Sequence, residues 1–479
     1  MPGTPSVEEL LERLAQRDEL IEALSAELGH ARVRIAELEA RLGQTSKNSS
    51  KPPSSDGLAK PAPKSLRKRG VRKPGGQDGH PGSTLAPVGV PDEVIAHEPG
   101  CCRGCGHDLA GAPEVGRERR QVFDIPPITV RVIEHQLIKR RCGCGTATSA
   151  DAPAGVTAPV QYGPRITAII VYLYVGQFLS KKRTAAALAE LFGTPVSEGT
   201  VAAMTTRAAG GLDGFLEWVR ANLAAAEVVN FDETGLRVEG KLRWVHSAST
   251  GRYSLITVHD RRGTKGMDAA GVLPEFTGVA VHDAWAPYDT YHAITHALCN
   301  AHVLRELQAV TDTTPTGQWC WAQQSADALR ELNELVNDAR TASPHPDGPH
   351  PDSIDSAALA AAVHRYRSGA LLGLEATRTR ASKVMGKHNA LARRLLDRQD
   401  DYLRFTVDPR VPFDNNGAER EIRMIKLRQK VSGCLRTLTG AQQFCAIRSY
   451  LATAAKHGTH FFAALTTLAE GRPWLPETA

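Results

Sequence analysis

The chain has 479 residues, of which 42% are hydrophobic, and this is more sequence than one core usually organises, so we expect several folded units joined by linkers. Nine cysteines without a secretory leader, and a longest apolar run (166–179) that is interrupted by Gln177, exclude a secreted disulfide-rich protein and a membrane protein. We expect a reduced, cytoplasmic protein in which that run is a buried helix. The net charge is +6, yet residues 47–73 alone carry nine Lys and Arg against Asp56, so the remainder is slightly acidic.

Residues 1–43 show an apolar heptad pattern, which is typical of a coiled coil. Arg17 and Ala31 occupy positions of the seam and weaken it. The pattern predicts a helix that pairs with a second copy of the chain, and an isolated helix packed on the body is the alternative. The heptad positions are Val7, Leu10, Leu14, Ile21, Leu24, Leu28, Ile35, Leu38 and Leu42.

Residues 44–90 are rich in Ser, Pro, Gly, Lys and Arg, as in TSKNSSKPPSSDG. Such a composition buries too little apolar area to fold alone, so we expect a disordered basic linker. Its positive charge suits attraction to a phosphate backbone, which is independent of sequence and sensitive to salt. A solvated linker with no partner is an equally good interpretation.

Residues 91–155 contain three cysteines, two β-rich runs on either side of Pro126-Pro127, and two further cysteines. We expect a small β-hairpin module that is held together by a metal ion. The cysteines are Cys101, Cys102, Cys105, Cys142 and Cys144.

Residues 156–222 have a helical pattern. One helix is expected at 184–192, a break follows at Gly193-Thr194-Pro195, and Ser197 is a suitable N-cap for the next helix. Two short helices around a tight turn resemble a helix-turn-helix, although ordinary helix hairpins share this pattern. Three cations just before the first helix could contact phosphates beside a groove-bound second helix. They are Lys181, Lys182 and Arg183.

From residue 223 the pattern changes to three consecutive strands (VVNFDET, KLRWVHSAST, YSLITVHD), a helical stretch and a fourth strand, GVAVHD. We expect residues 223–300 and 401–455 to form an α/β domain closed by a late helix after Asp414. Residues 301–400 are then a helical insertion, and residues 456–479 a C-terminal tail.

Three acidic residues occupy special positions in this domain. Asp232 is expected at the end of the first strand, Asp283 at the end of the fourth, and Glu419 in the first turns of the late helix. In a ribonuclease-H-like arrangement the first and fourth strands are neighbours and a C-terminal helix crosses them, so the three carboxylates can meet. Such hard oxygen ligands suit Mg²⁺ or Mn²⁺, and two of these ions can cleave a phosphodiester. The alternatives are N-caps and solvated strand ends, and Glu233 competes with Asp232.

The late helix carries a charged stripe, because four residues beginning with Glu419 fall within about 40° of one direction at 100° per residue. Ile422 and Ile425 lie beside the stripe and can pack the helix on the sheet. The stripe would then face a DNA backbone, and a merely solvated face is the alternative. Its cations are Arg423, Lys426 and Lys430.

Six motifs occur together in one order: SKNSSKPPSSDG, CCRGCG…DIPP…RCGCG, DETGLR, HDAWAPY, CNAHVLREL and DNNGAEREIR. In these motifs the chain resembles the transposases of the insertion-sequence-sixty-six family over essentially its full length. The resemblance implies a DDE-type transposase, with Asp232 as the acid of DET, Asp283 as that of HDAW and Glu419 as that of NNGAER. It also implies helper proteins encoded by the same element.

The resemblance further implies a zinc-binding module. The second pair is Cys142-x-Cys144 rather than C-x-x-C, and of the first three cysteines Cys102 and Cys105 have the better spacing, although Cys101 could replace Cys102. Four thiolates form a closed tetrahedral site, so the Zn²⁺ would be structural. Free thiols are the alternative.

The sequence therefore predicts a multidomain α+β protein: a coiled-coil helix, a zinc-binding β module, a helix-turn-helix-like region and a ribonuclease-H-like catalytic domain with a large helical insertion. The leading hypothesis is a transposase that binds the terminal inverted repeats of an insertion sequence, nicks DNA with Mg²⁺ or Mn²⁺, and transfers the 3′ ends to target DNA as a homo-oligomer. The main rival is a catalytically inactive DNA-binding regulator derived from a transposase. A hydrolase of small substrates would leave the cationic linker and the coiled coil unexplained.

Overall fold

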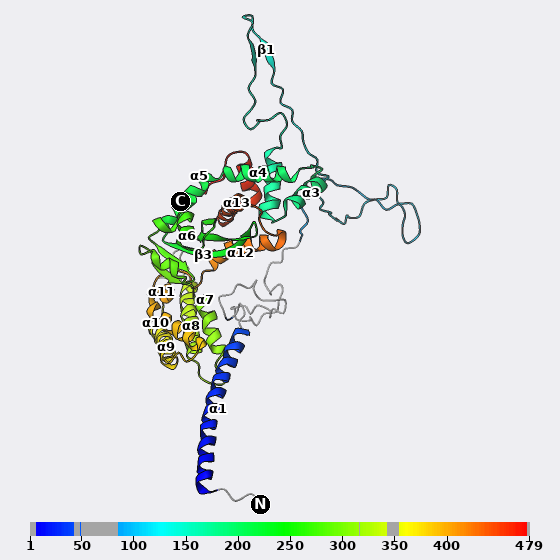
Figure 1. Cartoon of the computed structure of the whole chain (residues 1–479). Coiled ribbons are helices and arrows are strands. Elements are labelled where there is room, and N and C mark those ends of the chain that lie inside the picture. Colours follow the sequence, from blue (N-terminus) through cyan, green and yellow to red (C-terminus); the bar gives the residue numbers. More distant parts are fainter. Residues whose placement is uncertain (1–5, 43–47, 49–84, 316, 343–353, 477–479) are drawn as a thin grey trace, which may run out of the picture.

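The computed structural model describes residues 6–42, 48, 85–315, 317–342 and 354–476. Most of the predicted basic linker (44–90) therefore lies outside the described residues. The described part forms a body of helices around a mixed sheet, with one long helix extending from one side and two irregular arms from the other (Figure 1). No helix of the described part is long and apolar enough to cross a bilayer.

The N-terminal helix α1 (Val7–Leu42) is continuous over 36 residues, so the predicted helix is confirmed. The heptad side chains that the structure describes are exposed: those of Leu14 and Ile21, for example, are 52% and 56% exposed. The exposed apolar side chains thus form a stripe along this helix, which extends away from the body (Figure 1).

The region between α1 and the body contains much less β-structure than the sequence predicted. Within the described residues 85–163, the only strands are β1 (Lys139–Arg141) and β2 (Ala147–Ser149), which pair in antiparallel register. The prediction of longer strands on either side of Pro126-Pro127 is therefore wrong. Apolar side chains there, such as Val122, stay exposed because no second layer covers them, and extended segments without cross-strand partners make no ladder.

The next region is helical, as predicted. The run 166–179 forms a buried helix with a π-helical end, and the turn between α3 and α4 has the expected boundaries, with Gly193 in the left-handed conformation and the Ser197 hydroxyl accepting from Thr200 N–H. The elements are α2 (Pro164–Val171), the π-helix Tyr172–Gly176, α3 (Lys181–Phe192), α4 (Glu198–Gly210) and α5 (Asp213–Ala224).

A five-stranded mixed sheet in the order β5-β4-β3-β6-β7 forms the centre of the body. The first three strands are an antiparallel meander, whereas β6 and β7 run parallel to β3. The first and fourth strands are therefore neighbours, as predicted, and the fifth strand was missed because its four residues carry no recognisable pattern. The strands are β3 (Val228–Val238), β4 (Lys241–Ser249), β5 (Ser254–His259), β6 (Val279–His282) and β7 (Thr295–Leu298), and α6 (Thr264–Ala270) connects β5 to β6.

Two late helices complete this unit. Helix α12 (Asn416–Ser432) packs on β3 and β4, and α13 (Leu438–Lys456) packs on the edge strand β5. Side-chain hydroxyls of α13 accept the N–H groups of β5: Ser449 Oγ accepts from Ile256 at 2.8 Å and Thr453 Oγ1 from Ser254 at 3.1 Å. The helix thus covers an edge that would otherwise expose unpaired donors.

The segment between β7 and α12 is a helical block with its own core, at the lower left of Figure 1. Helices α8 and α9 approach closely because Gly373 faces Trp321; a Cβ at this glycine would lie 2.4 Å from the ring. The block is joined to β7 through Arg404, whose Nε donates to the His296 carbonyl at 2.7 Å. Its helices are α7 (Asn300–Asp312), α8 (Trp321–Ala342), α9 (Ser356–Ala376), α10 (Lys383–Asp397) and α11 (Gln399–Leu403).

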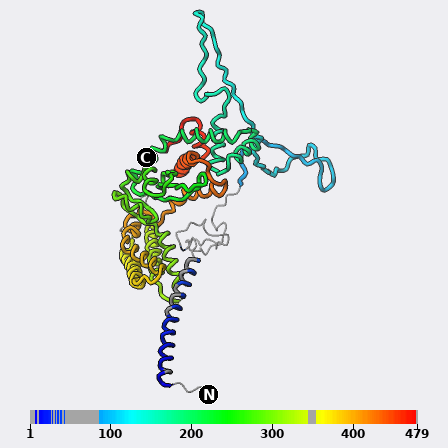
Figure 2. Tube along the Cα trace, in the orientation of Figure 1, coloured from blue at the N-terminus to red at the C-terminus, as the bar shows by residue number. Residues whose placement is uncertain are grey.

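The segment that we expected to be a tail contains a further helix, α14 (Phe461–Ala469). Its residues Leu465 and Leu468 are buried in the core around the sheet, where α14 packs against α2. The trace in Figure 2 shows the red segment near the end of the chain lying on the body beside the helical region. The segment folds onto the domain because these apolar side chains are buried there, which its short sequence did not indicate.

Candidate active site

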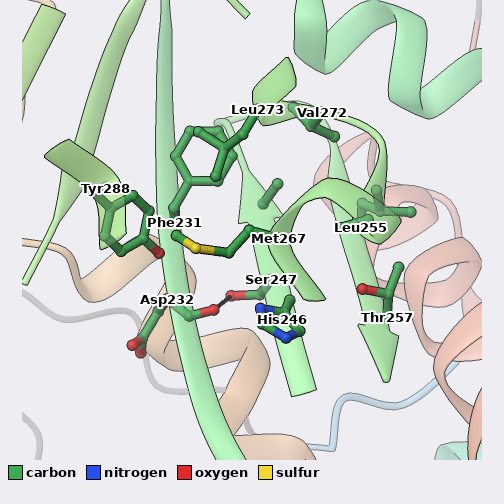
Figure 3. Close-up of a pocket in the computed structure, with 12 residues that line it drawn as sticks. Phe231, Asp232, His246, Ser247, Leu255, Thr257, Met267, Val272, Leu273 and Tyr288 are labelled. Atoms are coloured by element: carbon green, nitrogen blue, oxygen red, sulfur yellow. Dashed lines mark hydrogen bonds between the residues drawn. The ribbon is translucent and has the colours of Figure 1, made fainter. Parts of the chain in front are cut away.

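Asp232 lies inside β3 rather than at its end, because the hairpin with β4 continues to Val238. The parallel pairing of β3 with β6, however, stops at Asn230, opposite Val281. Asp232 therefore sits where the ladder to the fourth strand ends. Figure 3 shows its carboxylate directed away from the apolar pocket that Phe231 enters, as expected when successive side chains alternate between the faces of a strand.

Asp283 directly follows β6. In the parallel register Asn230 is opposite Val281, so Asp232 and Asp283, each two residues further along, are at the same level. Neighbouring strands are about 4.8 Å apart. The side chains of two adjacent strands are thus brought together at the carboxyl end of β6.

Glu419 lies in the first turn of α12, as predicted, and its amide donates to the Asn415 carbonyl at 3.2 Å. Ile422 and Ile425 are buried under the helix and fix the face that α12 turns to the sheet. This orientation leaves Glu419 beside the two aspartates.

The three carboxyl groups are partly or largely buried, and this raises their pKa values. Burial raises the pKa of Asp232 well above its usual range, and the negative charges of Glu233, Asp283 and Glu419 raise it further. Burial likewise raises the pKa values of Asp283 and Glu419, although Arg262 opposes the first shift and Arg305 the second. Several partly buried carboxylates that lie close together destabilise the folded state unless cations bind among them.

Glu233 is a functional candidate whose partners the sequence did not reveal. Its carboxylate forms an ion pair with Arg262 at 2.8 Å and accepts from the Tyr288 hydroxyl at 2.8 Å. The Arg262 guanidinium in turn lies 3.9 Å from the ring centroid of Trp285. Burial raises the pKa of Glu233 to about 7, and Asp283 contributes to this shift. The only sequence signal for a role of Glu233 was its position next to Asp232 in the DET motif.

A second unexpected neighbour comes from the first turn of α7, in the CNAHVLREL motif. His302 Nε2 lies 4.0 Å from a Glu419 oxygen, and burial lowers the pKa of His302 to about 3, so the imidazole is neutral. Cys299 is buried, and its Sγ accepts from the backbone N–H of Asn415 at 3.2 Å. The helical insertion thus contributes to the surroundings of Glu419.

The donor chemistry of Asp232, Asp283 and Glu419 fits a hard divalent cation, since all ligand atoms would be carboxylate oxygens and positive charge would relieve their repulsion. Within the described ranges, no three His, Cys, Asp or Glu side chains are already arranged as a metal cluster. What the structure provides is the convergence of three acids from β3, the end of β6 and α12.

The charged stripe of α12 is only partly free. Arg423 and Lys430 are exposed, and Arg423 lies 3.8 Å from Glu419. Lys426 is instead half-buried, and its ammonium donates to the Gly235 carbonyl of β3. The expectation of three equivalent surface cations is therefore corrected: Lys426 attaches the helix to the sheet.

The cations of the helix-turn-helix-like region form the first turn of α3 instead of preceding it. Lys182 and Arg183 are exposed, whereas Lys181 lies 5.9 Å from the Tyr174 ring. Three positive charges at a helix N-terminus oppose the helix dipole. The exposed side chains of Lys182 and Arg183 are therefore available for an anionic partner, which would offset the unfavourable interaction with the helix dipole.

The cysteine pairs occupy two separate turns. The Cys102 carbonyl accepts from Gly106 N–H at 2.8 Å and the Cys142 carbonyl from Gly145 N–H at 2.9 Å. The two turns belong to different arms, the light-blue one and the cyan one of Figure 2, so the structure does not bring the four predicted ligands together. Hydrogen bonds between Cys144 and Thr146 lower the pKa of Cys144 to about 7.

Comparison with known families identifies the family of the chain. The model described as the transposase IS66 family matches residues 159–443, more than half of the chain. The chain belongs to this family. The zinc-finger binding domain of IS66 transposases matches residues 99–145, which include all five cysteines of the arms. A family of unknown function matches residues 3–86, and no curated protein matches the chain.

Proposed function

We propose that this IS66-family chain is an active DDE transposase in which Asp232, Asp283 and Glu419 hold two Mg²⁺ or Mn²⁺ ions. The observation that carries the proposal is the placement of the three acids: Asp232 lies where the β3–β6 pairing ends, Asp283 directly follows β6, and Glu419 is in the first turn of α12, which packs on β3. The strand order β5-β4-β3-β6-β7 with a late helix across β3 supports a ribonuclease-H-like fold. Bound ions would activate water or a 3′-hydroxyl and stabilise the leaving oxygen.

The chain's own residues have separate tasks. The three carboxylates orient the ions, while Glu233, which is held by Arg262 and Tyr288, supports the β3 segment that carries Asp232. The exposed cations Arg423 and Lys430, with those of α3, bind the phosphates of the transposon ends and the target DNA. Phosphate contacts of this kind position the duplex without reading its sequence.

The arms are proposed to close around one structural Zn²⁺ held by Cys102, Cys105, Cys142 and Cys144. The family match over residues 99–145 supports zinc binding, and small modules of this kind take their folding free energy from the ion. Purified chain should contain about one zinc per molecule, and a Cys142→Ser/Cys144→Ser variant should contain almost none. Full zinc in that variant would assign the ion to other ligands.

The exposed stripe of α1 is proposed to pair with α1 of a second copy, since a two-stranded coiled coil buries such a seam. DNA transposition joins two ends, which a dimer can hold at once. Helper proteins of the same element complete the proposed assembly.

The catalytic proposal is tested with Asp232→Asn, Asp283→Asn and Glu419→Gln, which keep side-chain size and remove the charge that holds the ions. Each variant should abolish Mg²⁺-dependent nicking of a duplex carrying the element's terminal repeat, yet bind that duplex in a gel shift. The matched control is Asp213→Asn, an exposed acid in the first turn of α5. Wild-type protein that binds but never nicks would favour the inactive regulator, and near wild-type nicking by Asp283→Asn would refute the triad.

A further inference from the structure

The backbone immediately after Asp283 has an unusual conformation. Ala284 has φ +66°, in the left-handed region that residues other than glycine rarely adopt. An alanine has no polar side chain that could hydrogen-bond locally and stabilise this conformation. Strained positions of this kind persist only where the surroundings determine them strongly. The other non-glycine residues with positive φ in the described part, Phe178, Glu239 and Arg380, do not adjoin a proposed metal ligand.

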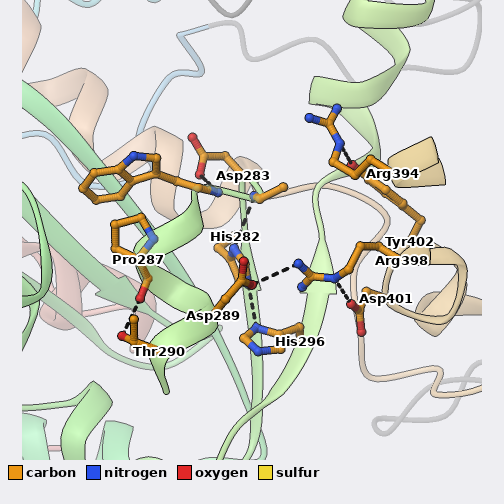
Figure 4. Close-up of polar contacts among 12 residues, drawn as sticks. His282, Asp283, Pro287, Asp289, Thr290, His296, Arg394, Arg398, Asp401 and Tyr402 are labelled. Carbon is orange, nitrogen blue, oxygen red and sulfur yellow. Dashed lines mark hydrogen bonds and ion pairs between the residues drawn. The ribbon is translucent and has the colours of Figure 1, made fainter. Parts of the chain in front are cut away.

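The support for this conformation comes from His282, on the other side of Asp283. The Ala284 N–H donates to His282 Nδ1 at 3.2 Å. The His282 ring is completely buried and stacks on the Tyr288 ring, with centroids 4.2 Å apart and planes 19° from parallel. On its other edge, Nε2 lies 3.0 Å from Nδ1 of His296 on β7 (Figure 4). The ring is therefore held on three sides.

These contacts define the tautomer. Because Nδ1 accepts from a backbone N–H, it carries no proton, and the Nε2–H of His282 donates to His296 Nδ1. An imidazole whose Nδ1 accepts a hydrogen bond while its Nε2–H donates one is the neutral form.

The same turn directs the carboxylate. Asp283 Oδ1 accepts from the Trp285 N–H at 3.1 Å, so the side chain of Asp283 is aligned by the residue that follows Ala284. If Ala284 left the left-handed region, the Trp285 amide would move and the carboxylate would lose this alignment.

We propose that His282 is a positioning residue for the metal site: its Nδ1 holds Ala284 in the left-handed conformation and thereby sets the direction in which Asp283 presents its carboxylate to the divalent cation. The inference rests on the proposed role of Asp283 as a ligand. The alternative is that His282 is only a packed core residue.

The test compares two amide substitutions in the full-length chain. His282→Asn places an oxygen close to the position of Nδ1, whereas His282→Gln places its amide further out, near Nε2. Mn²⁺ binding, followed by electron paramagnetic resonance, is the readout besides nicking. His282→Gln should weaken Mn²⁺ binding about tenfold, comparable with the penalty of an unsupported left-handed alanine, and His282→Asn should stay within about threefold of wild type.

A third variant separates positioning from packing. Ala284→Gly should restore Mn²⁺ binding in the His282→Gln background, because glycine adopts positive φ without a Cβ penalty. Asp283→Asn should lose Mn²⁺ binding. If it does, but His282→Asn and His282→Gln bind Mn²⁺ equally well, or Ala284→Gly does not restore binding, the role of His282 is overturned and the triad is left intact. Unchanged binding in Asp283→Asn would instead refute the ligand role on which the inference depends.

Discussion

Asn415 joins the strand of Asp232 to the helix of Glu419, and its replacement should affect both stability and cleavage. The side chain is fully buried. Its Nδ2 donates to the Phe231 carbonyl at 2.6 Å, and its Oδ1 accepts from Asn230 Nδ2 at 2.8 Å. These two hydrogen bonds connect the residues on both sides of the β3–β6 boundary to the start of α12.

Asn415→Ala removes both bonds and leaves the Phe231 carbonyl buried without this donor. A typical bond contributes about 1 kcal/mol, and a buried group left without a partner costs about 1–3 kcal/mol, so the free energy of unfolding should fall by about 3 kcal/mol. Because the Asn415 carbonyl also accepts from the Glu419 amide, the carboxylate should shift and nicking should fall at least about tenfold.

The measurement is urea unfolding without divalent ions, beside a nicking assay in Mg²⁺. The matched control is Asn416→Ala, since Asn416 is exposed and its side chain bonds only to Asp414 among the contacts described; this change should stay within about 0.5 kcal/mol of wild type. An Asn415→Ala protein that is as stable and as active as the control would refute the reasoning.

Three further predictions concern charge and assembly. The raised pKa of Glu233, from 4.5 to about 7, means that the folded state binds the proton more tightly, so metal-free stability should decline as pH rises from about 4.5 to 7. Glu233→Gln should remove up to about 3 kcal/mol of that decline in the free energy of unfolding. A variant with the same pH profile as wild type would contradict this role of Glu233. Deleting residues 1–43 should lower the oligomer mass in light scattering; an unchanged mass would reject the coiled coil. Replacing Arg423 and Lys430 together with Ala should weaken duplex binding and reduce its salt dependence, whereas an identical salt slope would place the DNA elsewhere.

Much of the local structure was predictable, because helices and strands are specified by nearby side chains. The heptads predict α1, the alternating patterns predict β3, β4 and β5, and Ser197 predicts the start of α4; the structure has all of these elements. The three acids of the candidate site were predicted from the expected ends of two strands and the start of a helix, and their role as metal ligands stays a prediction.

The arrangement around those acids depended on contacts between distant segments, which periodicity does not report. Continued pairing with β4 places Asp232 inside its strand, and the fold of the helical insertion brings His302 beside Glu419. Lys426 has the spacing of a surface cation, yet packing of α12 on β3 turns its ammonium to a backbone carbonyl. The sequence by itself determined which side chains are available and on which elements they lie. Only the tertiary structure decided their partners, since burial and long-range hydrogen bonds depend on elements that are far apart in the chain.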